Sequence, residues 1–128
     1  MIRSFLRSRI EGGRVTSVNR ALDASIAIDA HIMNAAGLFP FERVQVDNLT
    51  RGERFDSYVT EAEAGSGTIA INGGGGSRAQ IGDAIVIVSF GSLHQGQIET
   101  HRPRLVVVDS ANRLNLLEEA GTSPSTQA

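Results

Sequence analysis

The sequence predicts an all-β fold, and more narrowly a small closed β-barrel. Three observations support this class. The 128 residues fit a single domain with a real hydrophobic core and leave no room for a second module. About seven short apolar or alternating runs are typical of strands, and glycine-rich turns separate them. One short segment has the pattern of a helix.

The first third of the chain supplies strands and this helix. Residues 2–10 alternate apolar and arginine side chains, which predicts a strand with one basic side, and Gly12-Gly13 should then turn the chain. Another strand begins at Ser25. Asp29 is a suitable N-cap for a short helix that should end at Gly37.

The middle of the chain predicts a hairpin and two central strands. Residues 43–48 and 54–60 alternate cleanly on either side of a polar turn, which is the pattern of a β-hairpin. Residues 84–90 and 105–108 are almost continuously apolar, so both strands should be central. A shorter strand at 68–71 leads into a run of glycines.

The end of the chain carries weaker signals. We expect residues 1–110 to form the single barrel domain and residues 111–128 to be a partly disordered C-terminal extension. Within this extension, residues 114–120 have the pattern of one or two helical turns, and residues 121–128 resemble a loose tail.

Composition excludes several kinds of chemistry. The net charge of −2 argues against nucleic acid as a partner. The chain has no cysteine, which excludes a disulfide, a thiolate nucleophile and a Cys-based metal site, and three scattered histidines do not predict a metal cage. All 12 basic residues are arginines, so the lysine Schiff base of pyridoxal-phosphate enzymes is excluded. The absence of a signal-peptide or transmembrane pattern predicts a cytoplasmic protein without a membrane partner.

The Ala24-Ser25 bond is the candidate source of a cofactor. A serine hydroxyl behind a small residue, at the start of a strand, can attack the preceding carbonyl carbon. The resulting ester can eliminate, and hydrolysis then leaves an N-terminal pyruvoyl group, an electrophilic ketone. The ordinary alternative is a serine that only satisfies backbone groups in an uncleaved barrel.

Many positions match one family in the same order. The matching positions are Met1-Ile2-Arg3, Ser25, Ala27-Ile28 and the segment 29–38, then Gly52, Arg54-Phe55, Tyr58, Gly65-Ser66, Ile71-Asn72-Gly73, Gly82-Asp83, Ser89-Phe90 and Arg102-Pro103. On these positions the chain resembles the pyruvoyl-dependent aspartate 1-decarboxylases over roughly residues 1–110.

The resemblance implies a six-stranded double-psi β-barrel with one or two short helices. It also implies a homotetramer with active sites at subunit interfaces, a proenzyme that cleaves itself between residues 24 and 25, and an accessory maturation factor as a further partner to consider. The implied reaction converts L-aspartate, a small amino acid, to β-alanine and carbon dioxide. The product would feed pantothenate and coenzyme A synthesis, or a secondary pathway that needs β-alanine. The implied cofactor is a pyruvoyl group made from Ser25, with no pyridoxal phosphate and no metal.

The resemblance also assigns roles to residues. Ser25 is the pyruvoyl precursor, Arg54 binds a substrate carboxylate with help from Arg9, and Tyr58 protonates the decarboxylated carbon. Being four apart on a strand, Arg54 and Tyr58 should project from the same face. Ser57 stands where the family has a threonine that activates self-cleavage.

The glycine run completes the expected site. Asn72, Gly73, Gly74 and Gly75 should line it, with backbone N–H groups that can donate to a carboxylate or an oxyanion. The run is not a phosphate-binding loop, because no Gly-Lys-Ser/Thr follows it.

Several departures from the family pattern lie near this chemistry. Ala24 replaces a glycine, and its methyl group would cost about 1–2 kcal/mol if the precursor holds this residue at positive φ. The other departures are Ala21 for histidine, Leu22 for tyrosine, Arg9 for lysine, and Glu11 and Ser77 for histidines. Two alternatives therefore stay open: a decarboxylase of another amino acid, and an uncleaved relative that binds a small acid or a partner without catalysis.

Overall fold

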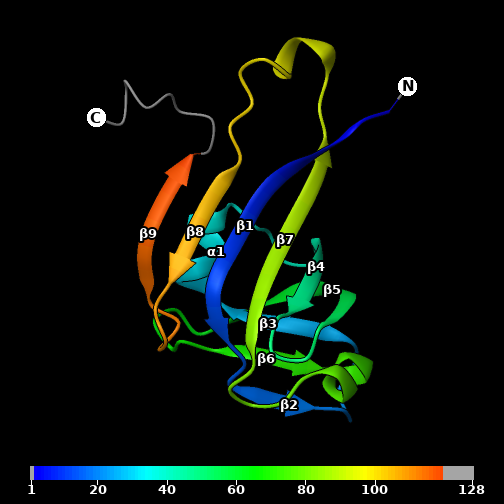
Figure 1. Cartoon of the computed structure of the whole chain (residues 1–128), viewed down its shortest axis with the longest axis vertical. Coiled ribbons are helices and arrows are strands. Elements are labelled where there is room, and N and C mark those ends of the chain that lie inside the picture. Colours follow the sequence, from blue (N-terminus) through cyan, green and yellow to red (C-terminus); the bar gives the residue numbers. More distant parts are fainter. Residues whose placement is uncertain (1, 120–128) are drawn as a thin grey trace.

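Residues 2–119 are described by the computed structural model and form a mainly-β fold (Figure 1). The small all-β class expected from the sequence is confirmed, although nine strands occur in this range, where the family resemblance implied six. The elements are β1 (Ser4–Arg14), β2 (Ser17–Asn19), β3 (Ser25–Asp29), α1 (Ala30–Ala36), β4 (Arg43–Asn48), β5 (Glu53–Ala62), β6 (Ile69–Asn72), the 3₁₀ helix η1 (Gly73–Arg78), β7 (Ala84–Ser92), the 3₁₀ helix η2 (Gln95–Gln97), β8 (Arg104–Val108) and β9 (Leu114–Glu119).

The strands follow the order β2-β6-β3-β5-β4-β7-β1-β8-β9. Figure 1 shows β1, β7 and β8 side by side, with β3 and β6 running across them at the lower end of the view. Three neighbouring pairs are parallel, namely β1 with β8, β2 with β6 and β3 with β5. Parallel neighbours need long crossover connections, so segments distant in sequence meet throughout the fold.

The core is centred on β3 and its neighbours. Ile26 and Ile28 of β3, Val46 of β4 and Val59 of β5 are fully buried. Branched side chains of this kind pack well on a pleated surface and gain roughly 25 cal/mol for each Å² of apolar area removed from water. This packing fixes where β3 begins. The two central strands expected at 84–90 and 105–108 are also confirmed, because β7 and β8 each have a strand on both sides.

β1 does not end where the sequence suggested. Gly12-Gly13 was expected to turn the chain, but the strand continues to Arg14 through an irregularity in its pairing with β7. Gly12 has a φ of +86°, and a Cβ atom there would collide with the carbonyl oxygen of Val108. The glycine therefore forms a bulge that bends the strand while its pairing resumes at Gly13.

The helix α1 forms as expected. The Asp29 carboxylate caps it by accepting from the backbone N–H of His31, and Gly37 ends it at a φ of 71°. The same carboxylate accepts from the backbone N–H groups of Gly65 and Gly67. Burial opposes ionisation of Asp29, but these three hydrogen bonds outweigh it and lower its pKa. No helix within residues 2–119 has the length and apolar character needed to cross a bilayer.

Residues 114–119 form a strand, which corrects the helical turns expected there. β9 pairs antiparallel with β8, with Val106 opposite Leu117. Asn112 secures the preceding turn, because its side-chain amide donates to the carbonyl oxygens of Arg14 and Gly67. Long-range pairing with β8 thus overrides a weak local helical pattern. The loose tail expected at 121–128 lies outside the described residues.

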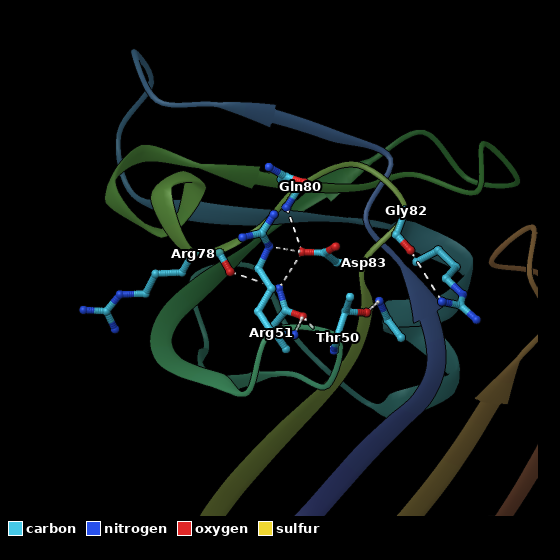
Figure 2. A network of polar contacts seen from close by, with 9 residues as sticks. Thr50, Arg51, Arg78, Gln80, Gly82 and Asp83 are labelled. Atoms are coloured by element: carbon cyan, nitrogen blue, oxygen red, sulfur yellow. Dashed lines mark hydrogen bonds and ion pairs between the residues drawn. The ribbon is translucent and has the colours of Figure 1, made fainter.

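A polar network fixes the β4-β5 turn against the segment before β7 (Figure 2). The buried Asp83 carboxylate accepts hydrogen bonds from the side chains of Asn48 (2.8 Å) and Arg51 (2.9 Å) and from the backbone N–H of Gln80 (2.9 Å). Asn48 also donates to the carbonyl oxygen of Arg78. The Asn48 hydrogen bond is the main reason that the pKa of Asp83 lies below its usual range.

This network predicts an acid-sensitive contribution to stability. Asp83→Asn should lower the free energy of unfolding at pH 7 by about 2 kcal/mol, because hydrogen bonds to a charged group are lost. Since the folded-state pKa is depressed, the contribution is fully present above the unfolded pKa of about 4 and is lost as the pH falls through the folded-state value. Urea unfolding of parent and variant at pH 7 and at pH 3 measures both effects.

The control is Asp56→Asn, because Asp56 pairs with Arg43 on the surface, where both side chains are more than half exposed. This change should alter the free energy of unfolding by less than about 1 kcal/mol. A difference between parent and Asp83→Asn that stays constant from pH 7 to pH 3 would contradict the assignment.

Candidate functional site

Ser25 lies at the first position of β3, where its hydroxyl is held on two sides. The residue is buried, with 7% of its surface exposed. Its Oγ donates to the carbonyl oxygen of Asp23 (3.2 Å) and accepts from the side-chain amide of Asn72 (3.2 Å). The antiparallel register of β3 and β6 places Ser25 directly opposite Asn72. The structure therefore brings together these two expected site residues next to the Ala24-Ser25 bond.

Gly73 packs directly against the backbone of Ala24. Its φ is +73°, and a Cβ atom at this position would lie 2.6 Å from the Ala24 nitrogen, closer than real side chains approach. Only glycine satisfies both constraints, because it lacks the Cβ and adopts positive φ readily. The first residue of η1 thus packs against the residue that precedes the bond expected to break.

Ala24 itself is not held at positive φ. Among residues 2–119, the non-glycine residues with positive φ are Phe41 and Asn112. The condition for the expected strain of 1–2 kcal/mol at Ala24 is therefore not met in this conformation. The restrictive contact at Ala24 is instead with Gly73, which follows β6.

The glycines of η1 differ in their surroundings. This segment forms a 3₁₀ helix, in which the Ser77 hydroxyl donates to the Gly74 carbonyl oxygen. A Cβ at Gly75 would meet the Phe55 ring at 2.8 Å, whereas a Cβ at Gly74 would meet nothing within 4 Å. Gly75 is thus required by packing, and Gly74 leaves open space.

β5 carries Arg54 and Tyr58 beside this centre. Phe55 and Val59 are buried, while Arg54 is exposed and Tyr58 is half-buried. This alternation matches the expectation that Arg54 and Tyr58 share a face. β5 runs parallel to β3 with Val59 paired to Ile26, so Tyr58 lies next to the start of β3.

Arg54 has an acidic partner that sequence reasoning missed. Its Nε donates to Asp47 Oδ1 at 2.7 Å, and the two residues stand directly opposite each other on β5 and β4. Both line a hollow of about 440 Å³ at the β4-β5 turn, together with Glu53. The carbonyl oxygen of Arg54 also accepts from Arg78 (3.2 Å). The register of the predicted hairpin, which pairs Asp47 with Arg54, is the signal that could have found this partner.

Arg9 and Ser57 are not brought to Ser25 by any contact among the described residues. Arg9 lies on β1, which β7, β4 and β5 separate from β3 in the sheet, and its guanidinium pairs with Glu11 at 3.1 Å. Ser57 pairs with Val44 across the hairpin. A single chain therefore assembles part of the expected site.

Two other features bear on the chemistry of this region. The Tyr58 hydroxyl makes no hydrogen bond to another residue in the range 2–119, and its ring contacts that of Phe41 at 6.2 Å between centroids. In the same range, no group of three or more His, Asp or Glu side chains is arranged to hold a metal ion.

Comparison with known proteins identifies the family. A family model described as aspartate decarboxylase matches residues 1–115. The aspartate 1-decarboxylase of Bordetella parapertussis is 41% identical over 114 residues, covering 89% of this chain and 93% of the relative. That of Leptothrix cholodnii is 39% identical over 124 residues (97% and 95%), and that of Chromobacterium violaceum is 40% identical over 130 residues (100% of both). The chain belongs to the aspartate decarboxylase family.

Proposed function

We propose that this chain cleaves itself between Ala24 and Ser25 and then decarboxylates L-aspartate to β-alanine, acting as a carbon-carbon lyase. The observation that supports this most directly is the Ser25 hydroxyl, held by Asn72 and Asp23 at the start of a buried strand. Family membership provides the reaction class. The product would supply pantothenate and coenzyme A synthesis or another pathway that uses β-alanine.

Self-cleavage requires a nucleophile, an anion-stabilising group and a covered site. Ser25 Oγ attacks the Ala24 carbonyl carbon, the peptide C–N bond breaks, and an ester replaces the amide. Elimination then removes the ester oxygen as the Ala24 carboxylate, and hydrolysis of the resulting enamine releases ammonia and leaves the pyruvoyl group at position 25. Asn72, already a donor to Ser25 Oγ, is suited to orient this oxygen. Ser57 is the second hydroxyl that we assign to this step.

The residues around Ser25 fit a pyruvoyl group. When present, such a group supplies an electrophilic carbonyl that binds an amine and accepts the electrons of the breaking C–C bond. Asn72 would hold the group at the start of β3, and the N–H groups of Gly73, Gly74 and Gly75 offer further donors. No pyridoxal phosphate and no metal enter this proposal.

Arg54 and Tyr58 are assigned to the substrate. Asp47 occupies Nε of Arg54, which leaves the Nη1 and Nη2 groups to form a two-pronged contact with a carboxylate. The Tyr58 phenol is free to deliver a proton to the carbon that loses carbon dioxide. Both residues lie on β5, so one strand positions both groups.

We further propose a homotetramer with active sites between subunits, in the cytoplasm. Arg9 and Ser25 lie on strands that are four places apart in the sheet, so Arg9 reaches a site most directly across a subunit boundary. Large exposed side chains, among them Leu49, Ile81 and Phe90, provide apolar surface for such contacts. An accessory maturation factor is a further partner to test.

Intact mass under denaturing conditions tests the first step. The parent chain should separate into fragments 1–24 and 25–128, the second carrying a terminal carbonyl that borohydride reduces. Ser25→Ala should stay at the full-length mass, because it lacks the nucleophile. A parent chain that also stays at full length after prolonged incubation, with and without cell extract, would rule out the proposed function. If cleavage occurs, carbon dioxide release from L-aspartate and from neutral amino acids then defines the substrate.

Gly73→Ala should slow self-cleavage about tenfold or more. The added Cβ would overlap the Ala24 backbone and so move the Ala24 carbonyl carbon away from the attacking Ser25 Oγ. The measurement is the time course of the fragments by mass. Gly74→Ala is the matched control, since a Cβ there meets nothing within 4 Å. Equal rates of cleavage for both variants would show that the Gly73 contact does not position the bond.

Asp47→Ala should raise KM for L-aspartate about tenfold with little change in kcat, because Arg54 loses the hydrogen bond that orients it for ground-state binding. Asp47→Asn keeps an acceptor for Nε and should change KM less. Steady-state kinetics on fully cleaved enzyme gives both values. A lower KM in Asp47→Ala would show instead that Asp47 competes with substrate for Arg54.

A further inference from the structure

Residues 39–42 form a tight turn with an unusual residue at its third position. The Glu42 backbone N–H donates to the Phe39 carbonyl oxygen (3.1 Å), Pro40 occupies the second position, and Phe41 occupies the third with a φ of 71°. A proline followed by positive φ is the pattern of a type II turn, whose third position favours glycine or asparagine. A phenylalanine there is strained.

Burial does not explain this phenylalanine. Its side chain is 75% exposed in the chain, so it contributes little to the core. Its backbone is fixed to β5, because its N–H donates to the Val59 carbonyl oxygen (2.7 Å) and the Val59 N–H donates to the Glu42 carbonyl oxygen (3.0 Å). The strained turn is therefore tied to the strand that carries Tyr58, beside that residue.

The Phe41 ring contacts the Tyr58 ring, with centroids 6.2 Å apart and planes inclined at 37°. No other ring contact of Tyr58 occurs among residues 2–119, and the phenol hydroxyl makes no hydrogen bond there. Arg43, which stands opposite Tyr58 on β4, directs its guanidinium to Asp56. Phe41 thus supplies the one aromatic ring that contacts Tyr58 among the described residues.

We propose that Phe41 is a positioning residue for Tyr58, and that the strained turn is kept because it places the Phe41 ring against the phenol. The inference rests on the proposed function, in which Tyr58 delivers the proton. A proton donor must keep its hydroxyl within hydrogen-bond reach of the carbon it serves, and a ring held in one orientation loses less freedom when it acts. In this arrangement the strained Phe41 backbone lowers the stability of the fold, and the Tyr58 ring is held in one orientation.

The chain provides a direct spectroscopic test. It contains one tyrosine and no tryptophan, so near-ultraviolet circular dichroism at 275–285 nm and fluorescence excited at 280 nm report Tyr58 alone. Phe41→Asn removes the ring and accepts positive φ. We expect a Tm about 2–4 °C higher than that of the parent, because strain is relieved. The tyrosine dichroism should weaken, and acrylamide should quench the fluorescence more strongly.

Two variants separate the ring from the backbone. Phe41→Ala also removes the ring but keeps the Cβ, so it should loosen Tyr58 equally without raising Tm. Phe39→Asn makes the same chemical change at a phenylalanine that is 72% exposed and has no ring contact with Tyr58. This control should leave the tyrosine signals as in the parent.

In cleaved enzyme, Phe41→Asn should lower kcat about tenfold with KM within about twofold, since only the proton-delivery step is affected. Three results in Phe41→Asn would each overturn the inference. Two of them are unchanged tyrosine signals and an unchanged kcat. The third is loss of the oligomer in size-exclusion chromatography, because Phe41 would then be an interface residue. A parent chain that never cleaves contradicts the proposed function, whereas the spectra of the uncleaved chain still decide whether Phe41 orders Tyr58.

Discussion

The close approach of Gly73 to the backbone of Ala24 is the constraint on which the candidate site depends. β6 pairs with β3 so that Asn72 faces Ser25, and the chain must then turn at once into η1 without displacing the residue before Ser25. A glycine at positive φ makes this turn possible. The serine hydroxyl, the amide that contacts it and the bond beside it are therefore all positioned by one strand pair and its continuation.

On the neighbouring strand β5, the charged group used by the proposed chemistry also has a partner that fixes its position. Arg54 is paired across the hairpin with Asp47. The turn between these two strands is in turn held by the Asp83 carboxylate through Asn48 and Arg51. A planar guanidinium fixed at Nε keeps its other two nitrogens in a defined direction, which is what recognition of a carboxylate requires.

Local patterns predicted most of the fold. The alternation in β4 and β5, the apolar runs of β7 and β8, and the cap residues Asp29 and Gly37 are signals that adjacent residues carry, and each element formed where expected. The errors arose where distant segments decide. Gly12 has the local pattern of a turn, but its role depends on the Val108 carbonyl, nearly a hundred residues away. The segment of β9 has a weak helical pattern, and only its pairing with β8 makes it a strand. In the site, the family pattern pointed to Ser25, Asn72, Arg54 and Tyr58, but the roles of Asp47 and Phe41 depend on register and turn geometry that no short motif encodes.

The position of β1 and β2 in the sheet would have a consequence for the protein if the Ala24-Ser25 bond breaks as proposed. Residues 1–24 contain β1, which lies between β7 and β8, and β2, which pairs with β6. After a cut before Ser25, the short fragment would stay hydrogen-bonded to the larger one, with β1 as an interior strand of the sheet. The two pieces would therefore part only when the whole sheet unfolds, and refolding of the separated pieces would become a bimolecular reaction that depends on concentration. Folding before cleavage is thus unimolecular, whereas recovery after cleavage is not, so processing would make the fold kinetically hard to rebuild once it is lost.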